Sequence, residues 1–392
     1  MTKFQRRFAL TALVVLASAI GVAACGGGGS STGSTTASGG ESTSAGAPTA
    51  EAKNASAGKS AAEELIKPLI GQPSPFPVTE SLTQVPKGAT IAYMDCGSPI
   101  CALLWELMEP AATTMGVHLE RIKAGSAANT VSAAFDTVVT KQPAAVIVGA
   151  INVELWASQA KELQQDNIPV VTTGVTGAEP YGVVAPQSAE KSNAWGGERM
   201  AAYVAAKMHP DANVVFSEIP ELPLTVEIAE RFSEKLPEYC PECTVRTVDI
   251  GIETIGNTAP QTIVSDLQAH PETNVVVLGS DEVGTGLPAA LQAAGLSVET
   301  LGYFPSPTGL QYVKEGKETA VLASDLALGS WNLVDLAARD INGQKPGGEA
   351  QAEGITVQQF LTQKDITFNP AKGWSGYPDF PERFAKLWGV KP

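Results

Sequence analysis

The sequence contains little of what enzymes and metalloproteins need. It has three histidines among 392 residues, and two of them, His209 and His270, directly precede a proline, so a histidine-built metal site is not expected. The motifs G-x-S-x-G, H-E-x-x-H and G-x-x-x-x-G-K-[ST] are absent. We therefore expect no catalytic activity, no bound metal and no cofactor.

Positive charge is also scarce. The chain carries 26 Lys and Arg against 41 Asp and Glu, a formal net charge of −15. Nucleic acids and anionic membrane surfaces both attract Lys and Arg, so neither is an expected partner. The length allows two domains or three, with 44% hydrophobic residues to fill their cores. A chain of this size needs no disulfide scaffold to fold.

Only one long apolar run is present, residues 8–24, between three basic residues and Cys25. Charge, a short apolar stretch and small residues at the end are the layout of an export signal. The residues Val22-Ala23-Ala24-Cys25 resemble the bacterial lipobox, whose cysteine is diacylated and becomes the mature N-terminus. We predict a signal peptide over 1–24 and a lipid on Cys25 that is the protein's only membrane contact. An uncleaved membrane anchor is the alternative. Loss of the three basic residues would change the net charge from −15 to −18.

The next segment, 25–60, is almost entirely Gly, Ser, Thr and Ala. It offers too little apolar surface to offset the entropy of ordering, so we predict a disordered tether. Such a coil would span on the order of 30 Å. Residues 61–87 lead into the folded body with a short helix over 61–67 and three prolines, Pro73, Pro75 and Pro77.

From residue 88, short β-branched runs alternate with amphipathic helical stretches. Most of the runs are continuously apolar, which is typical of parallel strands buried on both faces. We expect strands at 90–95, 117–122, 144–148, 169–173, 213–217, 244–250, 274–278, 300–303 and 320–323. The helices are expected at 100–115, 128–141, 152–166, 189–208, 224–236, 259–269, 283–294 and 328–342. The alternation predicts an α/β protein with doubly wound parallel sheets.

Several segments occur in an order that resembles a known family. They include IAYMDCGSPICALLWELMEPAATTMGV, SNAWGGERMAAYVAAKM and, most specifically, NVVVLGSDEVGTGLPAALQAAG. Together with the export signal, they resemble the type I periplasmic binding proteins, the sugar-binding-like solute-binding lipoproteins of ABC importers.

The resemblance implies two doubly wound lobes joined by a three-strand hinge, which the chain crosses near Pro186, near Ser324 and at 347–354. The N-terminal lobe would comprise 88–187 plus 325–347, and the C-terminal lobe 188–324 plus 350–365. The tail, 366–392, is rich in aromatic residues, among them Trp374, Tyr377, Phe380, Phe384 and Trp388. We expect it to pack on a lobe, because these side chains would otherwise form an exposed apolar patch.

Ligands of open α/β sheets bind beyond the carboxyl ends of the strands, so two facing lobes form one cleft that closes about a hinge. The candidate ligand-binding residues follow from position. From the first lobe they are Asp95, Gly97, Ser98, Ile100, Asn152, Trp156 and Thr173. From the second lobe and the hinge they are Trp195, Glu218, Ser280, Asp281, Tyr303, Phe304 and Asp325.

Some of these candidates have structural alternatives. Ser98 before Pro99 could cap a helix, and Asp281 could cap the helix that follows it. Trp156 and Trp195 could be core residues. Asp95, at the end of a buried strand, is harder to explain structurally, and we favour a ligand contact for it.

The sequence departs from the family's sugar-binding pattern at three places. Sugar binders usually have Asp-Arg, Arg and Asp where this chain reads Thr173-Gly174, Glu218-Ile219 and Phe304-Pro305. The guanidinium forks that hold hydroxyl groups are therefore missing. A less polar or a cationic small molecule is the alternative ligand to a sugar.

Four cysteines remain after Cys25. An even number in an exported protein indicates disulfides, and we predict the local pairs Cys96–Cys101 and Cys240–Cys243. A four-cysteine zinc site would need both pairs to meet, although the proposed fold puts them in different lobes. The C-x-x-C at 240–243 leaves a helix instead of opening one, which argues against a redox role.

These features predict a monomeric solute-binding lipoprotein that captures a small molecule outside the cytoplasm and delivers it to an ABC permease. The alternative is a receptor domain with the same lobes that signals to a membrane kinase, and the sequence does not separate the two.

Overall fold

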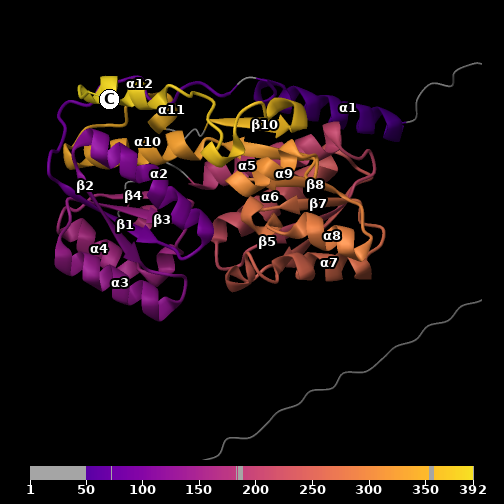
Figure 1. The fold of residues 1–392 in the computed structure, drawn as a ribbon, viewed down its shortest axis with the longest axis horizontal. Helices are drawn as coiled ribbons and strands as arrows, with labels where there is room; N and C mark the ends of the chain where they lie inside the picture. Colours follow the sequence, from indigo (N-terminus) through magenta and orange to yellow (C-terminus); the bar gives the residue numbers. More distant parts are fainter. Residues whose placement is uncertain (1–49, 72, 182, 184–188, 353–356, 392) are drawn as a thin grey trace, which may run out of the picture. The chain divides into compact units, whose positions relative to one another are not determined.

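The structure is a computed structural model that describes residues 50–391 apart from 72, 182, 184–188 and 353–356 (Figure 1). These residues belong to one compact unit, Pro48–Pro392. The predicted signal peptide, Cys25 and most of the predicted tether lie outside the described residues. Within the described part of the chain, every helix is too short or too polar to cross a membrane.

The first sheet is fully parallel and has the strand order β2-β1-β3-β4. Its strands are β1 (Thr90–Asp95), β2 (His118–Lys123), β3 (Ala145–Gly149) and β4 (Val170–Thr173). The helices around it are α2 (Pro99–Met115), α3 (Ala128–Lys141), α4 (Ala157–Gln165) and α10 (Leu326–Ile341). Figure 1 shows α3 and α4 on one face and α2 and α10 on the other.

Alternate residues of β1 enter two different cores. Ala92 and Met94 share a cluster with Phe135 of α3, whereas Ile91 and Tyr93 share one with Met108 of α2. Successive side chains of a strand point to opposite faces, so a strand covered by helices on both sides must be apolar at every position. This packing explains the continuous apolar runs in the sequence.

The second sheet has the order β10-β9-β8-β7-β5-β6, and only β10 runs antiparallel, beside β9. Its strands are β5 (Asn213–Glu218), β6 (Thr244–Asp249), β7 (Val275–Leu278), β8 (Glu299–Tyr303), β9 (Ala320–Ser324) and β10 (Gln358–Thr362). Its helices are α5 (Ala189–Lys207), α6 (Pro223–Tyr239), α7 (Ala259–Ala269), α8 (Leu287–Ala294) and α9 (Pro307–Lys314). All nine predicted strands are present, and the predicted α/β fold with two parallel-sheet lobes is confirmed. The tenth strand, β10, was not predicted.

The chain returns from the second sheet to the first at the end of β9. It leaves β9 at Ser324 and enters α10, which packs on α2, β3 and β4. The predicted crossing near Pro186 lies outside the described residues, as do residues 353–356 of the predicted third crossing. The exact lobe boundaries remain a prediction.

The lead-in helix begins earlier than the sequence indicated. Residues 50–60, predicted to be disordered, belong to α1 (Ala50–Ile66), which packs on α5 and α6. Alanine favours helix more than any other residue. A Cβ on Gly58 would lie 2.6 Å from the carbonyl oxygen of Glu238, so this glycine allows close approach of two helices. The small residues of 50–60, which are typical of a flexible tether, here allow a helix to pack closely on its neighbours.

Both ends of the described chain run from the second lobe to the first. On the N-terminal side, Ile70 bridges Phe360 of β10, and Thr79 donates its backbone N–H to Gly347 O over 2.7 Å. On the C-terminal side, Lys314 of α9 donates to Phe368 O over 3.0 Å. The final helix, α12 (Phe380–Trp388), packs on α2 and α10. These two segments accompany the hinge.

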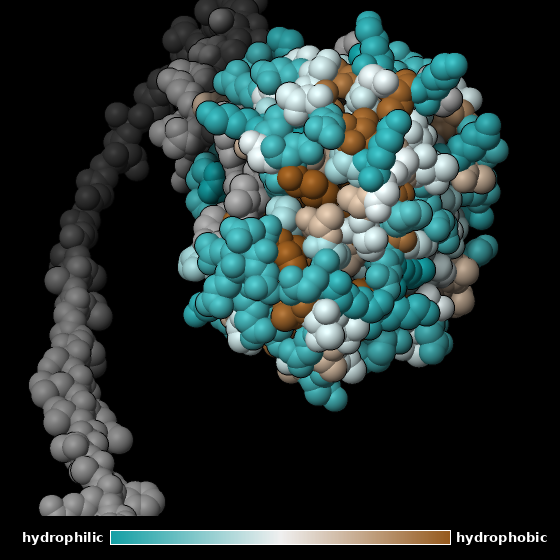
Figure 2. Space-filling view, turned by 90° about the vertical axis from the view of Figure 1, so that its left-hand side faces the viewer, coloured by the Kyte–Doolittle hydropathy of each residue, from teal (hydrophilic) through white to brown (hydrophobic). Residues whose placement is uncertain are grey.

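Hydrophilic residues cover most of the face drawn in Figure 2. Figure 2 shows one face on which apolar residues form small, separate groups among hydrophilic ones. Among the described residues, Ile70 is the only large hydrophobic residue that is exposed, with 40% of its surface accessible. Isolated exposed apolar residues of this kind are usual on soluble proteins.

The four remaining cysteines lie in two separate pairs. Cys96 and Cys101 are joined at the start of α2, with their Cα atoms 5.9 Å apart. Cys240 and Cys243 are joined between α6 and β6, with their Cα atoms 5.3 Å apart. Both separations lie in the range that disulfides span.

Candidate functional site

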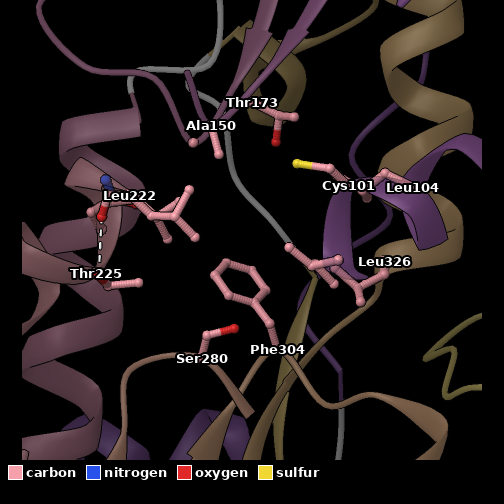
Figure 3. Close-up of a pocket in the computed structure, with 13 residues that line it drawn as sticks. Cys101, Leu104, Ala150, Thr173, Leu222, Thr225, Ser280, Phe304 and Leu326 are labelled. Atoms are coloured by element: carbon pink, nitrogen blue, oxygen red, sulfur yellow. Dashed lines mark hydrogen bonds between the residues drawn. The ribbon is translucent and has the colours of Figure 1, made fainter. Parts of the chain in front are cut away.

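A cavity of about 90 Å³ lies between the carboxyl ends of the two sheets. The first sheet contributes loops that follow β3 and β4, and the second contributes loops that follow β5, β7 and β8 (Figure 3). The lining residues are Ile100, Cys101, Leu104, Ala150, Thr173, Gly174, Asn193, Leu222, Leu224, Thr225, Ser280, Phe304 and Leu326. This is the edge where open parallel sheets bind ligands.

The lining is mostly apolar and, among the described residues, contains no charged side chain. Two of its four polar side chains are already engaged. The Thr225 hydroxyl donates to Leu222 O over 2.9 Å, as Figure 3 shows, and Asn193 Nδ2 donates to Glu227 Oε2 over 3.0 Å. The other two, the hydroxyls of Thr173 and Ser280, have no protein partner in the described part of the chain, so they are available to a ligand.

Three lining residues have a backbone conformation in the left-handed region. The φ angles are 49° for Ala150, 54° for Phe304 and 65° for Gly174. Outside glycine this conformation is rare, and it concentrates at functional sites where surrounding structure enforces it. The Phe304 ring lies 3.9 Å from that of Tyr303, centroid to centroid, and faces the middle of the cavity (Figure 3). The fold therefore tolerates strain where it forms the cavity wall.

A hydrogen bond between described residues crosses the cleft directly. The backbone N–H of Ile100, at the start of α2, donates to Glu282 Oε2 over 2.9 Å. Glu282 belongs to the short helix Asp281–Gly284 after β7 and is 6% exposed. Burial raises the pKa of the Glu282 carboxyl from 4.5 to about 7, although the Ile100 N–H acts in the opposite direction. The bond joins the two lobes beside the cavity.

The raised pKa of Glu282 predicts a pH-dependent stability. Between pH 4.5 and about 7 the folded protein holds this proton more tightly than the unfolded chain does, so raising the pH through this window removes stability. We expect Glu282→Gln, which can still accept the Ile100 N–H, to flatten this dependence. Urea unfolding midpoints of both proteins at about pH 5 and about pH 8 measure it. Equal changes in the two proteins would contradict the assignment.

Four of the residues proposed from the sequence line the cavity, namely Ile100, Thr173, Ser280 and Phe304. Asp95, Gly97 and Ser98 instead line a separate, open hollow of about 500 Å³ beside β2. There, Arg121 Nε donates to Asp95 Oδ2 over 2.7 Å, and the Gly97 N–H donates to Asp95 Oδ1 over 2.8 Å. This pairing gives Asp95 a structural partner that the sequence did not reveal.

Three other candidates from the sequence do not line the cavity. Asn152 caps a short helix by accepting the Glu154 N–H over 3.0 Å, and it lines a different hollow. Trp156 is fully buried and stacks on Phe135. The guanidinium of Arg199 lies 5.2 Å from the ring centroid of Trp195.

The acidic candidates contact other residues of the protein and do not line the cavity. Burial and then the neighbouring Asp249 raise the pKa of Glu218. Asp281, which is 2% exposed, accepts from the Ser306 hydroxyl over 2.9 Å. Asp325 caps α10 at Leu328 N and accepts from Ser375 in the tail. It lines a hollow of about 50 Å³ that shares four wall residues with the cavity.

Tyr303 is buried directly behind the cavity wall. Its exposure is 0%, and its hydroxyl accepts from Gln358 Nε2 over 2.9 Å. It supports the Phe304 ring and does not itself line the cavity.

Sequence reasoning missed the apolar side chains of the wall, which are Leu104, Leu222, Leu224 and Leu326. The sequence-based candidates were mainly polar residues that follow strands, because such residues would bind a polar ligand. Leu222-Pro223-Leu224, an apolar group where the loop after β5 enters α6, was the available signal. Apolar residues at the exposed end of a helix indicate burial against something else.

The chain is similar to known proteins in sequence and in fold. Residues 87–345 match the family model described as periplasmic binding protein domain. Among curated proteins, none is similar enough in sequence to be matched to the chain.

Solved structures share the fold at low sequence identity. An ABC sugar transporter subunit from Rhodobacter sphaeroides 2.4.1 is 18% identical with a TM-score of 0.58, and the match covers 71% of this chain and 99% of that one. A periplasmic solute-binding protein from Actinobacillus succinogenes 130z with bound D-allose is 17% identical, with a TM-score of 0.61 and coverage of 74% and 100%. A carbohydrate transporter from Acidothermus cellulolyticus 11B in complex with myo-inositol is 14% identical, with a TM-score of 0.59 and coverage of 76% and 99%.

Proposed function

We propose that this chain, which belongs to the periplasmic binding protein family, is the solute-binding lipoprotein of an ABC importer. It captures a small molecule between its lobes outside the cytoplasm and delivers it to a membrane permease. The family binds solutes and is not a class of enzymes. The observation that carries the proposal is the cavity between the carboxyl ends of both sheets, bridged by the bond from Ile100 to Glu282.

The position of the cavity suits capture by closure. Its walls come from both lobes, so a ligand in it would contact both and favour the closed form. We propose Ile100, Thr173, Ser280 and Phe304 as ligand contacts, together with the apolar wall. The other residues proposed from the sequence have intramolecular roles that favour a structural function.

The anchor is proposed from the sequence. Residues 1–24 would direct export, and a diacylated Cys25 would hold the protein at the membrane. The segment from residue 25 to the start of α1 at Ala50 would be the flexible part of the tether. The protein would be a monomer with both cysteine pairs oxidised, as its exported location favours.

Lipid attachment and delivery can be tested in one strain. We expect the protein to incorporate labelled palmitate and to fractionate with membranes, because the lipid supplies its membrane affinity. Cys25→Ser would lose both properties, and uptake of the solute would fall to that of a strain without the permease. Cys240→Ser, a matched cysteine substitution in the body, would keep the label. Label that survives Cys25→Ser would refute the anchor, and uptake without the permease would refute the importer.

A further inference from the structure

We infer that the cavity binds an uncharged, mostly apolar molecule about the size of one six-membered ring, with a hydroxyl or carbonyl group, and not a free sugar. The inference rests on the proposed function, since it takes the cavity between the lobes as the ligand site. Four features of the site support it: its walls, its polar groups, its lack of charge and its size.

The walls would remove water from a ligand but offer its polar groups no hydrogen bonds. Leucine side chains from both lobes surround the Phe304 ring, namely Leu104, Leu222, Leu224 and Leu326 (Figure 3 labels three of them). Burial of apolar ligand surface here is favourable in proportion to its area. A hydroxyl buried without a hydrogen-bond partner carries a large penalty, so a molecule with hydroxyls on every side is disfavoured.

The polar capacity of the cavity is small and localised. The two available hydroxyls belong to Thr173, at the end of β4, and Ser280, after β7. Each can donate one hydrogen bond and accept others. They can satisfy a ligand hydroxyl or carbonyl oxygen, but a monosaccharide would leave most of its hydroxyls without partners.

Nearby carboxylates do not line the cavity. Glu282 Oε2 accepts from the Ile100 N–H and Asp281 Oδ2 from Ser306, whereas Glu282 Oε1 and Asp281 Oδ1 are buried behind the wall without a partner among the described residues. Asp325 accepts from Ser375 and lines only the adjoining hollow. Glu218 does not line the cavity, and no Lys or Arg among the described residues does so. A charged ligand of either sign would therefore lose its hydration without meeting a counter-charge.

The size of the cavity limits the ligand. Its volume is about 90 Å³. The adjoining hollow of about 50 Å³ has a more polar lining, which includes Asp325, Ser330 and Asn332. An apolar protein cavity of about 150 Å³ accommodates benzene. A Cβ on Gly174 would lie 2.9 Å from Leu224 Cδ2, so even an alanine there would push Leu224 and disturb the wall.

The test is isothermal titration of the full mature chain with defined probes. Cyclohexanol and phenol represent the inferred class, D-ribose and myo-inositol the polyols, and choline and benzoate the ions. We expect cyclohexanol or phenol to bind at least about ten-fold more tightly than any polyol or ion. Tighter binding of a polyol or an ion, or no binding of the apolar alcohols up to about 10 mM, would overturn the inference.

Variants separate the ligand class from the site. Thr173→Val keeps the shape but removes a hydroxyl, so it should weaken cyclohexanol about five- to ten-fold and leave benzene unchanged. Thr137→Val, at an exposed position of α3, is the matched control and should leave the binding of both cyclohexanol and benzene unchanged.

Leu224→Trp fills the cavity and should abolish binding of every probe. Ser280→Leu is a second filling variant, to be used if Leu224→Trp does not fold. If a polyol binds and the filling variants abolish it, the site is correct and the ligand class is wrong. If cyclohexanol binding survives both folded filling variants, the cavity is not the site, and the proposed function loses its main support.

Discussion

Replacement of Arg339 by alanine is expected to lower the free energy of unfolding by about 3–5 kcal/mol. Arg339 and Asp335 of α10 are both 0% exposed, with Arg339 Nε 2.7 Å from Asp335 Oδ2. Loss of the guanidinium leaves the Asp335 carboxylate buried without its counter-charge, and it also removes the bond from Arg339 to the carbonyl oxygen of Glu80. Urea denaturation followed by circular dichroism measures the loss.

The effect should be large because Asp335 connects several parts of the chain. It also accepts from Trp388 Nε1 of α12 over 2.7 Å and from Gln351 over 2.8 Å. Through this carboxylate and its arginine, α10 holds the tail, the segment before β10 and the N-terminal segment that runs along the hinge. Arg339→Ala should therefore also increase proteolysis near the C-terminus.

Arg383→Ala is the matched control for Arg339. Arg383 and Asp379 form a pair at the same helical spacing of four residues, with Nε and Oδ2 2.9 Å apart, but their side chains are 41% and 58% exposed. Water screens an exposed pair and hydrates the partner that remains, so a much smaller loss is expected. Equal losses for the two variants would show that burial is not the cause.

Trp156→Ala is expected to lower the free energy of unfolding by about 3–5 kcal/mol and to leave ligand affinity unchanged. Trp156 has an exposure of 0% and stacks on Phe135, with ring centroids 4.6 Å apart and an interplanar angle of 6°. Its indole N–H donates to Ile151 O over 3.3 Å. Alanine would leave a cavity between α3 and the loop after β3. Urea denaturation and the cyclohexanol titration together test both parts.

Trp105→Ala provides the comparison for Trp156. Trp105, on α2, is only partly buried and lies 6.3 Å from Tyr93, ring centroid to centroid, so its truncation should cost less. Loss of ligand binding by Trp156→Ala at unchanged stability would restore Trp156 as a ligand contact.

The sequence predicted the sheets well because their cause is local. A strand that is buried on both faces is apolar at every position, as in AVIVG of β3 and VVVL of β7. The missed strand, β10, reads QQFLT and contains two glutamines. Gln358 is 1% exposed because its amide bonds Tyr303 and Ser324. This polar sequence forms a buried strand only because Tyr303 and Ser324 lie where they can bond the Gln358 amide.

The candidate site was less predictable for a different reason. Strand ends can be located from the sequence, and this located Thr173, Ser280 and Phe304 at the cavity. Whether a residue after a strand enters the cavity depends on the conformation of its loop and on its neighbours. Asp95 follows β1 as expected, yet the side chain of Arg121 from the adjacent strand pairs with it.

The sequence by itself determined the α/β class and the order of strands and helices along the chain, and it located the strand ends beside the cavity. These follow from hydrophobic periodicity and from the geometry of parallel sheets, both of which are properties of the local pattern. Only the tertiary structure decided the character of the site, because hydrogen bonding in three dimensions occupies Asp281, Asp325 and Glu282 within the protein. What remains facing the cavity is leucine, phenylalanine and two hydroxyls. The acidic candidates of the sequence thus lie outside the wall of the cavity in the folded protein.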